Sequence, residues 1–247
     1  MIAILILILS LGQSMRWAGA DVTTEFQSSE NQAHLIELFS SEGCSSCPPA
    51  DSWIASLRSN PNLWKQFVPI EFHVDYWNRL GWTDRLSKSL FTDRQQTYAR
   101  EWLNSNVYTP GFVLDGTEWR PTGNTAQWSE SATHRVGILS ARRTSKYTFL
   151  VTFVPIRTLA TVRVYGALLG NGLESKVNAG ENSGTVLKHE FAVLSLTQKK
   201  MEHEKMRYTA VIELKPPLEA LAKSYSVALW VTDGLSQKPI QVVGGDL

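Results

Sequence analysis

The two cysteines of the chain, Cys44 and Cys47, lie three positions apart in the stretch 41–51. A Cys-x-x-Cys pair at the start of a helix suits thiol–disulfide exchange, because the first helical turn has unpaired N–H groups and the positive end of the helix dipole, which favour a thiolate. Pro48 and Pro49 fit such a helix start, since proline is tolerated in the first helical positions. We therefore expect exchange chemistry, with Cys44 exposed and Cys47 covered.

Two other uses of the same cysteines remain open at the level of sequence. In an exported protein, a Cys44–Cys47 disulfide can simply brace the loop of a binding or structural module. Alternatively, both sulfurs and the imidazole of His73 can hold a soft ion such as Cu(I), although His73 is more simply an ordinary strand residue. Two sulfurs without a fixed third ligand are a weak pattern for zinc, whose structural sites have four ligands. We therefore assign no metal ligand and expect no cofactor.

A strand before the cysteines and a helix after them would place the pair at a turn. Residues 34–39 have the apolar, partly alternating character of a buried strand. Just after the pair, apolar residues recur at helical spacing and predict a short helix that begins at about residue 46 or 47: Ala50, Trp53, Ile54 and Leu57. Residues 67–75 are predicted to form a second strand. If it runs parallel to the first, its C-terminal end lies at the same sheet edge as Cys44.

The residues at the end of that second strand are expected to border the site. Tyr76 and Trp77 are candidate substrate-binding residues, because aromatic side chains at a site edge can pack against a ligand. Glu42 and Asp75 are the carboxyl groups expected to tune the pKa of Cys44, since a nearby negative charge raises the pKa of a thiol. Away from the thiol, Glu42 would be a solvated loop acid.

The next segment continues the alternation of strands and helices. Residues 93–103 are predicted to be helical from capping-box spacing and an apolar face. Residues 107–119 contain a strand entered through Thr109–Pro110 and an Asp-Gly turn, which predicts a hairpin. A second capping box at 124–127 predicts a helix that reaches Leu139. The resulting order is β-α-β-α-β-β-α.

This order, the Cys-x-x-Cys motif and the Thr109–Pro110 step resemble the thioredoxin fold, in which the residue before a cis-proline faces the active disulfide. Three phrases resemble, more narrowly, a family of exported bacterial thioredoxin-like proteins catalogued as a domain of unknown function: residues 37–51, 72–77 and 107–110. The resemblance implies a mixed-sheet α/β domain, a cis Pro110 beside the cysteines, and substrate contacts from Thr109 and Pro110. Ser45 and Ser46 replace the Gly-Pro of ordinary thioredoxins, so the resemblance does not imply a reduction potential for the Cys44–Cys47 pair.

Beyond about residue 143 the pattern changes to short alternating runs separated by Gly, Asn, Pro and Lys clusters. Six predicted strands without a helical period indicate an all-β sandwich of about 100 residues. They are expected at 147–154, 161–169, 186–196, 207–214, 225–232 and 239–243. His189 is most simply a strand residue, and residues 180–184 a turn. The expected chain is thus a thioredoxin-like α/β domain at 30–143 followed by a sandwich-like domain at 144–247, with few connections between them.

The N-terminus has the features of an export signal. Residues 2–11 form an apolar run that is too short to span a bilayer, and the small-residue triplet 18–20 suits signal cleavage. Residues 1–20 are therefore expected to be a signal peptide. The mature protein is expected to be periplasmic or secreted, without a membrane span.

The charge balance narrows the expected partners. Losing Arg16 with the signal leaves 24 − 1 = 23 basic against 23 acidic residues, a formal net charge of zero. This balance does not favour a nucleic-acid surface or a polybasic membrane patch. The expected partners are exported proteins or small thiols and disulfides, with an unknown redox partner that recycles the pair. The expected function is an exported thiol–disulfide oxidoreductase in which Cys44 attacks and Cys47 resolves substrate disulfides.

Overall fold

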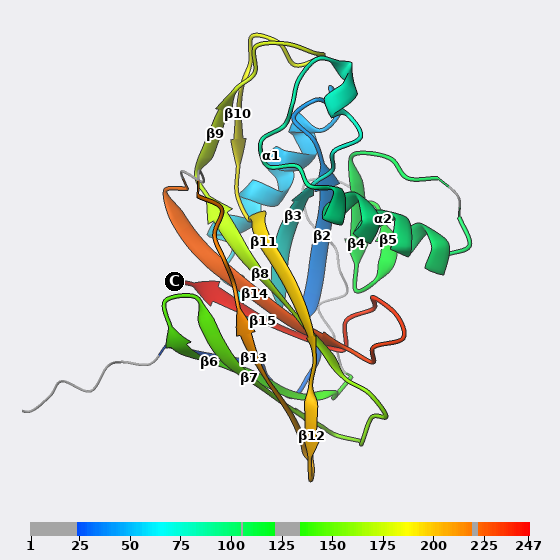
Figure 1. Cartoon of the computed structure of the whole chain (residues 1–247), viewed down its shortest axis with the longest axis vertical. Coiled ribbons are helices and arrows are strands. Elements are labelled where there is room, and N and C mark those ends of the chain that lie inside the picture. The colour runs from blue at the N-terminus through cyan, green and yellow to red at the C-terminus, as the bar shows by residue number, and fades with distance from the viewer. Residues whose placement is uncertain (1–23, 105, 122–133, 219–221) are drawn as a thin grey trace, which may run out of the picture.

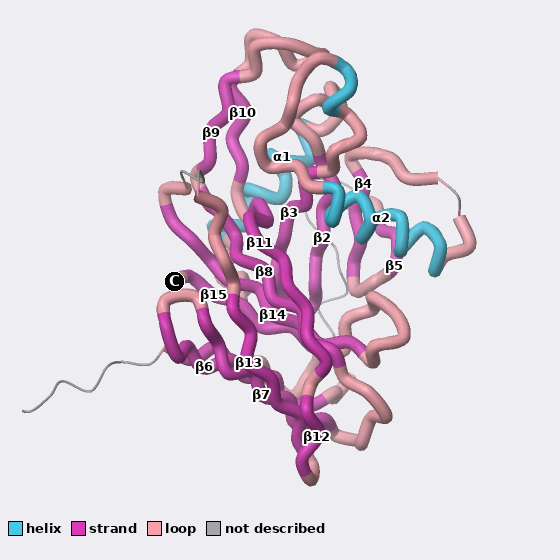
Figure 2. Tube along the Cα trace, in the orientation of Figure 1, coloured by secondary structure: helices cyan, strands magenta, loops and turns pink. Residues whose placement is uncertain are grey.

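Strands from both halves of the chain combine into shared sheets in the computed structural model, which describes residues 24–104, 106–121, 134–218 and 222–247. These residues form fifteen strands and two α-helices (Figure 1), and strands clearly predominate over helices (Figure 2). The expected signal peptide at 1–20 and the start of the expected helix at 124–127 lie outside the described residues. No helix in the described ranges is long and apolar enough to cross a bilayer.

The largest sheet has eight strands. In sheet order they are β15 (Gln241–Asp246), β14 (Ser224–Thr232), β8 (Arg163–Asn171), β11 (Ala192–Lys200), β3 (Phe67–His73), β2 (His34–Ser40), β4 (Gly111–Leu114) and β5 (Thr117–Trp119). Strands β2 and β3 are parallel, and helix α1 (Pro48–Ser56) connects them through a short 3₁₀ turn, η1 (Leu57–Ser59). A second 3₁₀ turn, η2 (Asn78–Leu80), and helix α2 (Ser89–Glu101) follow β3.

Two smaller sheets complete the fold. A five-stranded sheet contains β1 (Glu25–Gln27), β6 (Gly137–Ser145), β7 (Thr148–Pro155), β13 (Arg207–Glu213) and β12 (Glu202–Glu204). A separate hairpin of β9 (Leu173–Lys176) and β10 (Val186–His189) extends beyond the large sheet toward α1 (Figure 1). This hairpin connects β8 to β11, which are neighbours in the large sheet.

Both faces of the large sheet are covered in its C-terminal half. Along β14, Val227 and Leu229 pack into the apolar core shared with the five-stranded sheet, whereas Ala228 and Trp230 pack into the core that includes α1 and α2. Because alternate residues of a strand point to opposite faces, a strand covered on both sides needs apolar residues at nearly every position. The continuous burial of β14 is the result of this requirement.

The expected fold class, a thioredoxin-like α/β domain followed by a sandwich-like domain, is wrong. The protein is mostly β, and β11 of the C-terminal half pairs in parallel with β3 of the N-terminal half. The β1 strand likewise pairs with β6, and the expected boundary between residues 143 and 144 lies within β6. The physical reason is that an apolar strand pattern predicts burial and strand length but not which strand supplies the hydrogen-bond partner.

Most local elements nevertheless lie where the sequence predicts them. The strands before and after the cysteine helix, their parallel pairing and the hairpin β4–β5 are all confirmed. Helix α2 begins at Ser89, four residues before the predicted start. The predicted 186–196 strand is two strands, β10 and β11. Leu139 lies on β6 and not on a helix.

A buried ion pair connects α2 to the large sheet. The Nε of Arg94 donates to Glu37 Oε2 at 2.6 Å, and its Nη2 donates to Glu37 Oε1 and to the hydroxyl of Tyr98, each at 3.0 Å. The Nη1 donates to the side-chain oxygen of Gln237 at 2.8 Å. Burying two charges is tolerated only when both are paired and hydrogen-bonded, as they are here.

We expect Arg94→Met to lower the free energy of unfolding by about 3–5 kcal/mol, because the substitution leaves the Glu37 carboxylate buried without its counter-charge. Urea unfolding followed by circular dichroism measures this loss. The control is Arg207→Met, since Arg207 pairs with Glu204 on the exposed surface and should contribute no more than about 1 kcal/mol. Equal effects of the two substitutions would contradict a structural role for the buried pair.

Candidate functional site

Cys44 and Cys47 form a disulfide at the start of α1, with their Cα atoms 5.4 Å apart. Cys47 immediately precedes the helix, which begins at Pro48, one or two residues after the predicted start. The N–H groups of the first turn, however, are not directed at a sulfur: Pro48 and Pro49 have none, and those of Ala50 and Asp51 donate to the Cys47 carbonyl at 2.8 and 3.0 Å. The expected stabilisation of a thiolate by free N–H groups of this turn is therefore wrong, and only the helix dipole remains.

The expected exposure of Cys44 is also wrong, because both cysteines are 0% exposed. The tip of the β9–β10 hairpin covers the disulfide loop. Asn182 in this tip donates to the carbonyls of Glu42 and Cys44 at 2.9 and 3.0 Å, and the Ser45 N–H donates to the Glu181 carboxylate at 3.2 Å. The sequence predicts this segment only as a turn, but it is a cover for the disulfide.

A groove of about 600 Å³ begins beside the disulfide loop. It is lined by Ser46, Pro49, Ala50, Trp53, Tyr108, Thr109, Pro110, Phe112, Trp119, Arg120 and Pro121. Ser46 is exposed, and its hydroxyl oxygen lies 3.4 Å from the sulfur of Cys44. The Thr109–Pro110 bond is cis, which confirms the prediction. The groove therefore combines apolar and aromatic side chains with a hydroxyl next to Cys44.

Tyr76 and Trp77, the other predicted substrate-binding residues, do not line this groove, but Trp77 contacts Thr109, which does. The indole N–H of Trp77 donates to the Thr109 hydroxyl at 2.8 Å, and the Tyr76 hydroxyl donates to the Gln95 side chain at 3.3 Å. Burial raises the pKa of Tyr76 to about 12, so its hydroxyl stays protonated at neutral pH. Trp77 thus holds the side chain of Thr109, the residue before the cis-proline.

The two carboxyl groups predicted to tune Cys44 have other partners. Glu42 is fully buried and not a solvated loop acid: its Oε2 accepts from the Trp82 indole at 2.7 Å, and its Oε1 lies 3.4 Å from Nε2 of His189. The Asp75 carboxylate accepts from the hydroxyl of Thr92 at 2.6 Å. Glu42 therefore extends from the disulfide loop into a second group of charged residues.

This second group is a buried cluster of carboxylates and imidazoles, which we call the histidine cluster: Glu42, Glu71, His73, Asp84 and His189. Each member is at most 2% exposed. The Oε1 atom of Glu71 lies 3.2 Å from Nε2 of His73 and 3.4 Å from Nδ1 of His189. The opposite nitrogen of His73, Nδ1, contacts Asp84 at 2.6 Å. The two rings meet edge to face, with their centroids 4.6 Å apart.

Electrostatics within the histidine cluster favours charged groups. Burial alone would lower the pKa of His73, but Asp84 and Glu71 outweigh it and raise this pKa well above its ordinary value. Burial is likewise outweighed at His189, whose contacts with Glu42 and Glu71 raise its pKa to about 9. Burial would raise the pKa of Glu71, yet His73 and His189 lower it to about 2. The cluster is thus a strongly coupled ionic network.

Asp51 lies in the first turn of α1 and accepts a hydrogen bond from the Ser40 hydroxyl at 2.5 Å. Burial, and next the negative charge of Glu71, raise its pKa to about 8. It is therefore largely neutral at pH 7, in contrast to an ordinary aspartate.

Sequence reasoning finds the disulfide but not the histidine cluster or Asp51. One local signal is present: Glu71 interrupts an otherwise apolar strand, and His73 follows it on the same face. Isolated charges in apolar strands need partners. The partners are Asp84, 11 residues after His73, and His189, in the other half of the chain, and no local pattern connects either residue to this strand.

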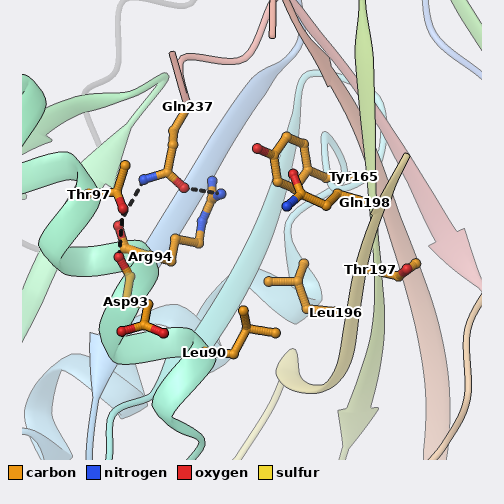
Figure 3. A pocket seen from close by; sticks show the side chains of 9 residues that line it. All are labelled: Leu90, Asp93, Arg94, Thr97, Tyr165, Leu196, Thr197, Gln198 and Gln237. Atoms are coloured by element: carbon orange, nitrogen blue, oxygen red, sulfur yellow. Dashed lines mark hydrogen bonds between the residues drawn. The ribbon is translucent and has the colours of Figure 1, made fainter. Parts of the chain in front are cut away.

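A second cavity, of about 280 Å³, lies between α2 and the large sheet (Figure 3). Arg94 lines it, which suggests an anion site at first sight. Its guanidinium is already bonded to Glu37, Tyr98 and Gln237, and Figure 3 shows the bond to Gln237. The charge is therefore satisfied within the protein, and the groove beside the disulfide is the stronger candidate site.

Comparison with known proteins supports the fold and leaves the function open. The sequence pattern of a family described as "Protein of unknown function (DUF1223)" matches residues 35–232. No curated protein matches the chain. Protein AGR_C_4864 from Agrobacterium tumefaciens has a similar structure, with 22% identity, a TM-score of 0.59, and coverage of 89% of this chain and 96% of that one. HBP35 of Porphyromonas gingivalis has 13% identity, a TM-score of 0.61, and coverage of 89% and 76%. At such identities the likeness concerns the fold alone.

The raised pKa of Asp51 predicts a pH-dependent cost of burying it. A carboxyl group whose pKa is higher in the folded than in the unfolded protein stabilises the fold at low pH, and this contribution is lost as the pH rises. For Asp51 the loss falls between pH about 4 and about 8. We therefore expect Asp51→Asn to become increasingly stabilising relative to wild type across this window, and the difference to become constant above it. Urea unfolding at a series of pH values measures it. Asp93→Asn, at an exposed position of α2, is the control, and a pH-independent difference for Asp51→Asn would contradict the prediction.

Proposed function

We propose reversible thiol–disulfide exchange at Cys44 and Cys47 as the function of this chain, which belongs to the DUF1223 family of proteins of unknown function. The observation that carries the proposal is the position of the disulfide: it closes a loop of only four residues at the start of α1, directly beside the groove that contains Ser46 and Pro110. A short disulfide next to a groove can exchange with a bound thiol or disulfide, which a disulfide enclosed by core residues on every side cannot.

The exchange proceeds in two balanced steps. In the reduced protein, the Cys44 thiolate attacks one sulfur of a substrate disulfide, forms a mixed disulfide and releases the first substrate thiolate. The Cys47 thiolate then attacks the Cys44 sulfur, forms the Cys44–Cys47 disulfide and releases the second substrate thiolate. Two electrons pass from the protein to the substrate, and the reverse sequence oxidises a dithiol. A separate redox partner, a dithiol or disulfide protein, restores the starting state.

The assignment of attack to Cys44 follows from its surroundings. Cys44 adjoins the exposed residues Ser45 and Ser46, and the Ser46 hydroxyl is close enough to donate a hydrogen bond to the Cys44 sulfur. Cys47 is equally buried but lies at the helix start, where its N–H donates to the Cys44 carbonyl at 3.2 Å and its carbonyl accepts from the first helical turn. Thr109 and Pro110 line the groove where the substrate backbone would lie, and the substrate is an exported protein or a small disulfide. A periplasmic or secreted location, with residues 1–20 as a signal peptide, belongs to the same proposal.

Access to the buried sulfur requires movement of the cover. Asn182 and Glu181 connect the β9–β10 tip to the disulfide loop through three hydrogen bonds. Loops held by a few polar contacts open locally at low cost compared with global unfolding. Opening of this tip therefore precedes attack in the proposed reaction.

The burial of both cysteines favours a second candidate function, a binding or structural module in which the disulfide only braces the loop. In that case the disulfide stabilises the fold but does not exchange in the native state. The two candidates differ in native-state reactivity, which the following experiments measure.

We expect reduced Cys47→Ser protein to form a stable mixed disulfide with glutathione disulfide, because Cys44 attacks but no thiol resolves the adduct. Intact-mass spectrometry of the native protein detects the adduct, and Cys44→Ser is the matched control that should give little. If neither variant forms an adduct under native conditions while both do so in urea, the bracing disulfide is the correct function.

Loosening the cover should accelerate exchange. We expect Asn182→Ala to raise the rate at which glutathione reduces the native disulfide by at least about fivefold, since one neutral hydrogen bond contributes about 1 kcal/mol and two are lost. Stopped-flow thiol titration gives the rate. Ser183→Ala changes the neighbouring exposed residue and should leave the rate unchanged. An unchanged rate in Asn182→Ala would show that this tip does not control access.

A further inference from the structure

The histidine cluster contains buried polar atoms that form no hydrogen bond. They are both carboxylate oxygens of Glu71, Oε1 of Glu42, Nε2 of His73, and both ring nitrogens of His189. Burying such an atom without compensation costs free energy. Five of the six face one another across distances of 3.2 to 3.4 Å. Three of them, Oε1 of Glu71, Nε2 of His73 and Nδ1 of His189, face one another, and a buried group of one carboxylate oxygen and two imidazole nitrogens is typical of metal ligands.

The geometry of the inward-facing atoms fits a single metal ion. One atom each of Glu71, His73 and His189 lies within 4.8 Å of the others. The carboxylate oxygen lies 3.2 Å from one imidazole nitrogen and 3.4 Å from the other. Ligands at zinc-like bond lengths of about 2.1 Å in a tetrahedral arrangement are about 3.4 Å apart. The two distances that involve Glu71 therefore already match those between ligands of a common ion, and the two imidazole nitrogens lie within 4.8 Å of each other.

The outward-facing atoms form a supporting shell. Asp84 contacts Nδ1 of His73 at 2.6 Å and leaves Nε2 directed at Glu71. Asp84 is itself fixed, because its carboxylate accepts from the N–H groups of Glu42 and Leu86 at 2.9 and 2.8 Å. Glu42 faces Nε2 of His189 and leaves Nδ1 directed at Glu71. Carboxylates behind metal-bound histidines set the tautomer and the ring orientation in this way.

We propose that Glu71, His73 and His189 bind one divalent first-row transition metal ion, with Asp84 and Glu42 as positioning residues. Two imidazole nitrogens and one carboxylate oxygen suit an ion of intermediate softness such as Zn²⁺, whereas Ca²⁺ prefers six or more oxygens and Cu(I) prefers sulfur. A divalent charge also offsets the three carboxylates of the cluster. This site differs from the Cys44, Cys47 and His73 set considered for Cu(I), and it does not depend on the proposed exchange reaction.

The test uses the full mature chain without affinity-tag histidines, stripped with a chelator. Titration with Zn²⁺ in a calorimeter should give one site per chain, and Co²⁺ should give the visible absorption of a four- or five-coordinate ion without the intense near-ultraviolet band of thiolate ligation. We expect His189→Gln to weaken Zn²⁺ binding at least about 100-fold and Asp84→Asn to weaken it about 10- to 100-fold. His203→Gln, at an exposed histidine, should bind as wild type does.

Two further measurements test the metal site without substituting a residue of the histidine cluster. X-ray absorption of the Zn²⁺-loaded wild type should show nitrogen and oxygen neighbours and no sulfur. The Cys44→Ser/Cys47→Ser double variant should retain Zn²⁺ affinity. Absence of Zn²⁺ and Co²⁺ binding by wild type, sulfur in the zinc shell, or undiminished binding in folded His189→Gln would each overturn the proposed site.

Discussion

The structure depends on the short parallel contact between β3 and β11. The N–H of Glu71 donates to the carbonyl of Phe191 at 2.9 Å, and Glu71 is opposite Ala192 in the register. This contact joins β2, β3, β4 and β5 to β11, β8, β14 and β15 in one sheet. It also places the end of β10, with His189, near the C-terminal end of β3, with Glu71 and His73. The histidine cluster is therefore a direct product of the pairing that unites the two halves of the chain.

Local patterns in the sequence predict the elements well and their assembly poorly, and β14 shows why. Its apolar run correctly indicates a strand, and the burial of Val227, Ala228, Leu229 and Trp230 on alternating faces means that both faces are covered. A two-domain interpretation needs such a strand to face solvent on one side. Continuous burial thus argues for a central strand between two layers, but the identity of the neighbouring strand depends on long-range hydrogen bonds that no local pattern specifies.

The same distinction holds for the candidate site: its short motifs can be predicted from the sequence, and its long-range contacts cannot. Cys44, Cys47 and the cis Pro110 can be predicted, because they belong to short motifs whose conformation is locally determined. Burial of the cysteines cannot be predicted in this way, since Asn182 covers them from a hairpin about 140 residues further along the chain. A similar separation along the chain lies between Glu42 and its partner His189. Within the histidine cluster, Glu71 is the lone acid of an apolar strand, and its sequence context alone indicates that a buried partner must exist.

Glu42 connects the disulfide loop to the histidine cluster through every polar group that it has. Its carbonyl accepts from Asn182, its N–H donates to Asp84, and its carboxylate contacts Trp82 and His189. A residue held at four points cannot follow a displacement of one partner without disturbing the others. The position of the disulfide loop and the orientation of His189 are therefore set together. This coupling also shows how a fully buried acid is accommodated two residues before Cys44: its carboxylate contacts the Trp82 indole and the His189 ring.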